Sequence, residues 1–174
     1  MNDAKTEHPL VQLARRAIAA FVTRNEKIEP PDDATPLMQT RAGAFVSLHK
    51  GAALRGCIGT IEPTQPTLAH EVIANAISAA SRDPRFAPLT PDELGELDIS
   101  VDVLEPAEPI SSLDELDPTT YGVIVERGRR RGLLLPDLEG IDTPQQQVNI
   151  ALRKAWITPD EPYRMYRFRV TRYH

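Results

Sequence analysis

The sequence predicts an α+β fold of two unequal lobes, each a two-layer arrangement of helices on a mainly antiparallel sheet. Three observations predict it: strands and helices mix without regular alternation, hairpins imply antiparallel pairing, and single-faced helices imply layers of helix on sheet. The 174 residues are enough for one sizeable core or two small ones. A proline-rich connection at 25–39 divides the lobes, so we expect residues 40–80 to form the smaller lobe and residues 1–39 plus 81–174 the larger one.

The first half of the chain is interpreted from hydrophobic spacing. Apolar residues recur at helical spacing over 9–24 and 67–80, which predicts two amphipathic helices. The three prolines within 25–39 forbid a regular element there. Residues 42–62 contain two short apolar stretches around a turn at HKGAA, which predicts a β-hairpin in the smaller lobe.

The second half of the chain carries clear helix-start signals and alternating segments. Three capping boxes predict helix starts, at Thr90 with Glu93, Ser112 with Glu115, and Thr143 with Gln146. Alternation over 98–105 predicts a strand, and the segments 121–126 and 131–136 predict a second hairpin. The run 163–173 predicts a last strand with one polar face.

Composition and charge narrow the class of protein. The chain is 41% hydrophobic and 26% charged, as soluble globular proteins are, and its net charge of -5 argues against a surface that coats nucleic acid. One cysteine forms no internal disulfide, and the polar start MNDAKTEHPLVQLARR lacks the apolar region of a secretory signal. No run is long and apolar enough for a membrane span, so we expect a cytoplasmic protein.

The only cysteine lies in HKGAALRGCIGTIE, residues 49–62. Because alternate strand residues share a face, we expect Arg55 and Cys57 to point one way and Leu54 and Ile58 to face the core. A neighbouring arginine favours the thiolate of an accessible cysteine. Cys57 is therefore a candidate catalytic residue, and the alternative is a small packing residue, since free cysteine is often buried.

The neighbours of Cys57 leave its chemistry open. His49 and His70 are near in sequence, but spacing establishes neither as a base. Gly56 and Gly59 weaken a strand, so a bulge, the close approach of another backbone, or a ligand on bare peptide groups must account for them. Neither the histidines nor the cysteine have metal-ligand spacing, and no phosphate loop or dinucleotide fingerprint is present, so we expect no metal and no cofactor.

Four strings resemble the AMMECR family over nearly the whole chain: LRGCIGT at 54–60, AASRDPRFAPLT at 79–90, RGLLLP at 131–136 and RKAWI at 153–157. The resemblance implies the two-lobed fold expected above, with the LRGCIG motif near a cleft between the lobes. It implies a site made of Arg55, Gly56, Cys57, Gly59, Asp83 and Arg85. The chain departs from the family where a KAGL-like string reads KAWI.

The resemblance implies partners and leaves the reaction unassigned. Bacterial and archaeal members resemble protein A of the AmmeMemoRadiSam system. The other two members of that system are a Memo-like protein, similar to class III extradiol dioxygenases, and a radical S-adenosylmethionine (SAM) enzyme. Any iron or S-adenosylmethionine chemistry would then belong to these partners.

Two charged clusters have both a structural and a functional interpretation. In SRDPRF, Asp83 either holds a loop by pairing with Arg82 or Arg85, or lines the cleft together with a guanidinium. The turn ERGRRRG presents four arginines that fit a solvated turn or a docking patch for an acidic partner, namely Arg127, Arg129, Arg130 and Arg131.

The residues support three hypotheses and do not decide whether the chain is an enzyme. In the first, the cleft binds a small metabolite or a modified side chain. There Arg55 would bind an anionic group, Cys57 would act as a thiolate or a close contact, and Gly56 and Gly59 would admit the ligand. The second is a non-catalytic adaptor that docks on the partner enzymes. RNA binding through the arginine turn ranks last, because the chain is acidic and the turn has no interleaved aromatic residues.

Overall fold

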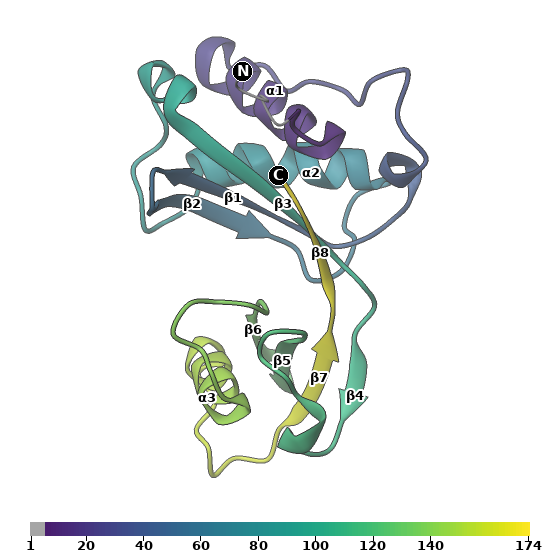
Figure 1. The fold of residues 1–174 in the computed structure, drawn as a ribbon, viewed down its shortest axis with the longest axis vertical. Coiled ribbons are helices and arrows are strands. Elements are labelled where there is room, and N and C mark those ends of the chain that lie inside the picture. Colours follow the sequence, from purple (N-terminus) through teal and green to yellow (C-terminus); the bar gives the residue numbers. More distant parts are fainter. Residues whose placement is uncertain (1–5) are drawn as a thin grey trace. The chain divides into compact units, whose positions relative to one another are not determined.

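The computed structural model describes residues 6–174 and confirms the α+β class. Internal contacts divide the chain into two compact units. The N-terminal unit runs to Val103 and includes Arg172–His174, and the C-terminal unit is Leu104–Thr171. Each unit contains one four-stranded sheet with helix packed on it (Figure 1).

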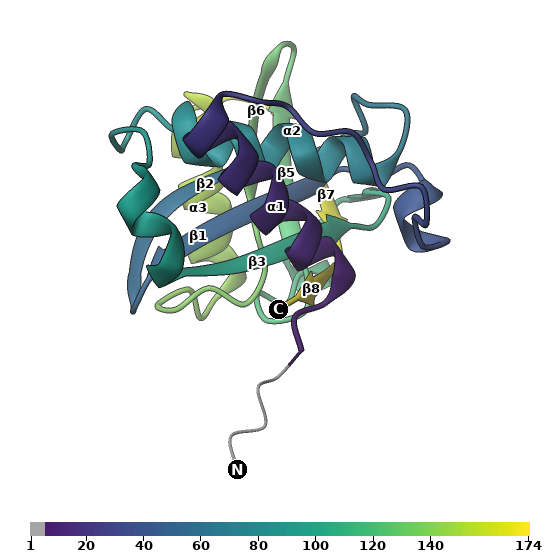
Figure 2. The ribbon, with the colours of Figure 1, turned by 90° about the horizontal axis from the view of Figure 1, so that it is seen from above.

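The N-terminal unit is a sheet covered on one face by two helices (Figure 2). Its strand order is β2-β1-β3-β8, so β2 is an edge strand. Its elements are α1 (Pro9–Arg24), η1 (Leu37–Gln39), β1 (Ala44–Lys50), β2 (Ala53–Gly59), α2 (Leu68–Ser81), η2 (Pro91–Glu96), β3 (Leu97–Leu104) and β8 (Val170–Tyr173). The core forms because apolar helix stripes meet alternate strand residues, among them Leu10, Leu13, Ile18, Val46, Leu48, Val72, Ile73, Ile99 and Val101.

The C-terminal unit repeats this layering with a single α-helix. Its strand order is β4-β7-β5-β6, and α3 packs on one face. Its elements are β4 (Glu108–Ile110), η3 (Leu113–Glu115), β5 (Gly122–Arg127), β6 (Arg130–Leu134), α3 (Pro144–Ala155) and β7 (Arg164–Phe168). Its core contains Val123, Val125, Leu134, Val148, Ala151, Leu152 and Ile157.

All three predicted capping boxes form, but only one starts an α-helix. Thr143 and Gln146 cap α3, whereas the boxes at Thr90 and Ser112 start the short 3-10 segments η2 and η3. No apolar stripe of helical length follows the N-cap residue Thr90 or Ser112, so packing does not extend these turns. A capping box therefore marks where a helical turn begins and does not set its length.

The two units do not coincide with the lobes expected from the sequence. Helix α1 packs in the same core as the β1–β2 hairpin, and β3 pairs directly with β1, from Ala44 opposite Val103 to Lys50 opposite Leu97. These contacts join residues 6–39 and 81–103 to the hairpin instead of to the C-terminal half. Residues 1–5 of the expected larger lobe lie outside the described part of the chain.

The predicted last strand is two strands. It breaks at Arg169, so that β7 belongs to one sheet and β8 to the other. The alternation of side chains continues through the run and does not reveal which strand each half pairs with. The short strand β4, which pairs antiparallel with β7, was not predicted.

Candidate functional site

Cys57 lies on the edge strand β2, opposite Ser47 of β1. The pairing between β1 and β2 shifts where Leu48 faces Gly56 and His49 faces Leu54, which leaves Arg55 as the extra residue of a β-bulge. The bulge interrupts the alternation, and Leu54 is 37% exposed instead of facing the core. The expectation that Leu54 faces the core was therefore wrong.

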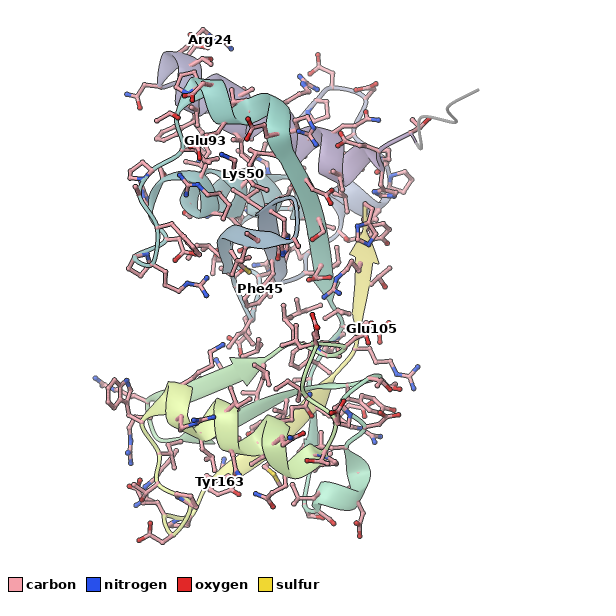
Figure 3. The ribbon with its side chains drawn as sticks, turned by 60° about the vertical axis from the view of Figure 1, so that its left-hand side comes forward. Arg24, Phe45, Lys50, Glu93, Glu105 and Tyr163 are labelled. Carbon is pink, nitrogen blue, oxygen red and sulfur yellow. The ribbon has the colours of Figure 1, made fainter. Side chains whose placement is uncertain are left out.

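The glycines beside Cys57 are explained by close packing. A Cβ at Gly56 would collide with the carbonyl oxygen of Ala79 in α2, so glycine lets helix and strand backbones touch. A Cβ at Gly59 would collide with the ring of Phe45, its cross-strand partner on β1 (Figure 3). Of the three explanations considered from the sequence, the close approach of another backbone accounts for Gly56, and the bulge lies at the residue before it. Gly59 instead makes room for the Phe45 side chain, which none of the three explanations named.

The loop after α2 binds the free backbone edge of Cys57. Asp83 Oδ2 accepts a hydrogen bond from the Cys57 N–H at 2.9 Å, and Arg85 Nη2 donates to the Cys57 carbonyl oxygen at 3.4 Å. Arg85 also binds both carboxylate oxygens of Asp83, at 3.0 and 2.8 Å. Hydrogen bonds from Arg85 and from the Cys57 amide hold the pKa of Asp83 well below its usual range, although burial opposes this. The interpretation of SRDPRF as a loop held by an Asp83–Arg85 pair is confirmed, and the lining of a cleft stays a prediction. We call this pair the Asp83–Arg85 clamp.

The Cys57 thiol is held in its neutral form. Burial raises its pKa, while a 3.3 Å hydrogen bond with Ser47 Oγ and the charge of Arg85 oppose that rise. Asp102 and Asp83 add to the rise through their negative charge. Of the two alternatives that the sequence left open for Cys57, the raised pKa favours a neutral thiol over a thiolate.

Arg55 does not assist Cys57. Its guanidinium binds Glu93 at 2.9 and 3.1 Å and donates to the carbonyl oxygens of Ala87 and Pro88. Lys50 joins the same carboxylate at 3.4 Å (Figure 3). The hydrogen bonds from Arg55 lower the pKa of Glu93 to about 2. The sequence-based pairing of Arg55 with Cys57 was wrong, because the bulge at Arg55 sends its side chain toward η2.

No general base contacts the thiol among the described residues. His70 Nδ1 hydrogen-bonds to Thr67 Oγ1 at 2.7 Å, at the start of α2. His49 is the residue opposite Leu54, beyond the bulge. Within residues 6–174, no three His, Cys, Asp or Glu side chains gather as a metal site. The arrangement around Cys57 suits contact and hydrogen bonding with a ligand better than nucleophilic attack.

Sequence reasoning missed two buried carboxylates near this strand. Asp102 of β3 is 1% exposed and accepts from Arg172 of β8 at 2.7 and 3.2 Å. Glu71 of α2 is also 1% exposed and accepts from Thr60, Thr64 and Gln65. The only sequence signal for such a buried carboxylate was Glu71 itself, the one acidic residue in the mainly apolar helix α2.

The predicted arginine patch is largely occupied by internal contacts. Arg130 binds Glu161 at 2.8 Å and the Trp156 carbonyl oxygen at 2.7 Å, and Arg127 donates to the Pro162 carbonyl oxygen. Arg131 pairs with Glu126 at 3.0 Å. The remaining member, Arg129, is exposed at the turn.

The fold and the site together define an α+β protein of two sheet units, with a half-buried cysteine on an edge strand whose backbone is bound by an Asp–Arg pair. The chain belongs to the AMMECR1 family, whose model matches residues 11–174. A Thermotoga maritima protein is 53% identical over 171 residues, covering 96% of this chain and 98% of that protein. A Clostridium acetobutylicum protein is 49% identical over 95% of this chain, which spans 36% of that longer protein.

A solved structure agrees with the fold. The crystal structure of an uncharacterized protein from Pyrococcus horikoshii is similar with a TM-score of 0.88 and 35% sequence identity, over 94% of this chain and 88% of that one. Across residues 6–174, no helix has both the length and the apolar character required to cross a bilayer.

Proposed function

We propose that this AMMECR1-family chain is a cytoplasmic binding component that works with a Memo-like protein and a radical SAM enzyme. Its ligand is a small metabolite or a modified side chain, and it contacts the Cys57 side of β2. The partners come from the family resemblance stated above. The binding role comes from the geometry of Cys57.

One observation carries the proposal: Cys57 is positioned through its backbone while its thiol stays neutral. Asp83 and Arg85 take the outward N–H and C=O of Cys57, which fixes the strand edge. The raised pKa of Cys57 leaves little thiolate near neutral pH, and thiolate is the form that attacks electrophiles. A fixed neutral thiol suits recognition by contact and weak hydrogen bonding.

Arg85 replaces Arg55 as the residue that binds an anionic group. The Arg55 side chain is 17% exposed and bound by Glu93, whereas the Arg85 side chain is 56% exposed while it holds Asp83. The Arg85 guanidinium also lies 5.4 Å from the centre of the Phe86 ring. An anionic ligand beside Cys57 would therefore meet Arg85 first.

The test compares small molecules that co-purify with the wild-type chain and with two variants, by mass spectrometry under native conditions. Cys57→Ser replaces the thiol by a slightly smaller neutral group that still donates and accepts hydrogen bonds, so we expect it to retain the compound. Cys57→Leu fills the site, so we expect it to lose the compound. Ala53→Leu adds the same bulk at an exposed position of β2 and serves as the control. A covalent adduct on wild-type Cys57, equal loss in both variants, or no compound on any of the proteins would contradict the proposal.

A second candidate is an adaptor that docks on these enzymes without binding a small ligand. The exposed Arg129 favours it, since internal ion pairs occupy its neighbours Arg127, Arg130 and Arg131. Affinity for the Memo-like protein separates the candidates. An adaptor loses affinity on Arg129→Ala and keeps it on Cys57→Leu, and no measurable affinity would contradict the proposed partnership.

A further inference from the structure

Trp156 is the only tryptophan of the chain, and neither packing nor backbone geometry explains it. Its side chain is 85% exposed. Its backbone is left-handed, with φ 58° and ψ 36°, at the C-terminal end of α3. Glycine adopts this conformation without the strain that a side chain adds. A bulky exposed indole at this position therefore stabilises neither the helix end nor the core.

The chain nevertheless holds Trp156 in place. The Trp156 N–H donates to the carbonyls of Leu152 and Arg153, and the next residue, Ile157, is buried and donates to Leu152 at 3.0 Å. Arg130 Nη1 donates to the Trp156 carbonyl oxygen at 2.7 Å and also binds Glu161. Arg130, the first residue of β6, thus holds the backbone of Trp156 in place.

Positive charge is concentrated in the two segments that meet where Arg130 binds the Trp156 carbonyl oxygen. Residues 126–131 and 153–161 contain six cations, namely Arg127, Arg129, Arg130, Arg131, Arg153 and Lys154, against three acids, Glu126, Asp160 and Glu161. The whole chain has a net charge of -5, so this excess is local. Arg129 and Arg153 are exposed, and neither forms an ion pair within the described residues. We call Trp156, Arg129, Arg130 and Arg153 the Trp156 platform.

We propose that the Trp156 platform docks an acidic segment of a partner protein. An apolar side chain of that segment packs on the indole, and its carboxylates meet Arg129 and Arg153. Tryptophan and arginine are the side chains that most often dominate protein–protein binding energy, and the unpaired cations select an acidic partner. This inference rests on neither Cys57 nor its ligand, so its failure and the failure of the ligand proposal are separable.

The same features fit single-stranded nucleic acid less well. Such binding uses several aromatic side chains on which successive bases stack along a basic groove. Trp156 and Leu54 are the large hydrophobic side chains exposed in the described residues, and only Trp156 is aromatic. One ring on an acidic protein gives a base a single stacking position.

The single tryptophan provides a direct readout of docking. The full chain is titrated with a short peptide of Asp, Glu and Leu, and the indole N–H resonance is followed by NMR. A peptide of Asn, Gln and Leu controls for charge, and fluorescein-labelled oligouridine tests for RNA. We expect the acidic peptide alone to shift the indole resonance saturably, with affinity that falls as salt rises.

Two variants separate docking from a structural role. Trp156→Gly should lose binding of the labelled acidic peptide and raise the melting temperature by about 2–4 °C, because glycine relieves the left-handed strain. Arg129→Ala with Arg153→Ala should weaken binding at least about tenfold. Arg16→Ala with Arg24→Ala removes the same charge from exposed positions on α1 and should leave affinity unchanged.

Several outcomes would overturn the inference. They are an indole resonance that no peptide shifts, an equal response to the neutral peptide, preference for oligouridine, and self-association that buries the indole without peptide. Lower stability together with unchanged binding in Trp156→Gly would assign the ring a structural role instead.

Discussion

The β1–β2 and β5–β6 hairpins share the same turn and the same strand glycine, but they differ at the residue that follows this glycine and in the bulge at Arg55. Each turns through two residues, of which the glycine, Gly51 or Gly128, has a positive φ. Each has a strand glycine against a helix carbonyl, since a Cβ at Gly56 would meet Ala79 and a Cβ at Gly132 would meet Ala151. Gly56 of LRGCIG therefore has a packing role, because it lets a strand lie against a helix backbone. Gly132 has the same role in the C-terminal unit.

The hairpins diverge at the residue after that glycine. Cys57 faces Ser47 across the ladder, whereas Leu133 faces Ile124. Both strand edges are bound by a cation at this residue, because Arg85 donates to the Cys57 carbonyl and Lys154 to the Leu133 carbonyl. Only Cys57 has a carboxylate on its N–H as well. The chemistry particular to the N-terminal unit therefore lies in Cys57, the Asp83–Arg85 clamp and Ser47.

The largest expected effect tests the shared architecture. Gly56→Ala and Gly132→Ala should each lower the free energy of unfolding by about 3 kcal/mol, because the new methyl group meets a helix backbone that cannot rotate away. Urea denaturation followed by circular dichroism measures both. Gly95→Ala, where a Cβ meets no atom, should stay within about 0.5 kcal/mol of wild type. A large loss of unfolding free energy at only one of the two strand glycines would contradict a shared packing role for them.

The next effect tests the clamp. Asp83→Asn should cost about 2 kcal/mol, because a nearly buried carboxylate that binds Arg85 and the Cys57 amide is replaced by a weaker, neutral acceptor. Lys154→Met in the other unit should cost about 1 kcal/mol, since it removes the hydrogen bond from Lys154 to the Leu133 carbonyl oxygen. Urea denaturation of both variants measures the two losses of unfolding free energy. Equal losses would show that the Asp83 carboxylate adds no stability beyond that of one hydrogen bond.

A smaller effect appears in acid. Hydrogen bonds lower the pKa of Glu93 and of Glu161 to about 2, in the N-terminal and the C-terminal unit respectively. A depressed pKa in the folded state contributes stability above the ordinary value near 4.5, and this stability disappears as pH falls toward 2. Glu93→Gln should flatten this slope more than Glu161→Gln, because the Glu161 side chain is 28% exposed against 15% and is better screened.

Thermal melts between pH 2 and pH 6, at low and high salt, measure these slopes. The Glu161 contribution should vanish in high salt, and the Glu93 contribution should persist in part. An identical response of the two variants would contradict the difference in burial.

The smallest effect concerns the partner of the thiol. Ser47→Ala should raise the apparent pKa of Cys57, because the Ser47 hydroxyl stabilises the thiolate. Alkylation rates against pH in the variant and the wild type measure this. Ser100→Ala, one strand further on β3, is the control and should leave the pKa unchanged. A lowered pKa in Ser47→Ala would contradict the assigned hydrogen bond.

Helices and strands were predicted from the sequence more completely than the pairing of the strands. Hydrophobic spacing located α1, α2 and the hairpins, because each has a face buried on its own unit's core. A bulge was one of three open explanations for the glycines of LRGCIG, but its position at Arg55 was not predictable, because the spacing of residues does not show where pairing with β1 shifts. The break at Arg169 was not predictable either, because the alternation of residues along a strand does not show which strand pairs with it. At the site, Cys57, Asp83 and Arg85 were predicted, while Ser47 required the register of β1 against β2.

The most direct test of the account is the alkylation rate of Cys57 against pH, in the native protein and in the denatured chain. The chain has no other thiol, so the signal belongs to Cys57 alone. We expect slow native alkylation with an apparent pKa above that of the denatured chain, which should lie near the reference of about 8.5. Rapid native alkylation with an apparent pKa well below that reference would contradict the neutral, clamped thiol and indicate a nucleophile.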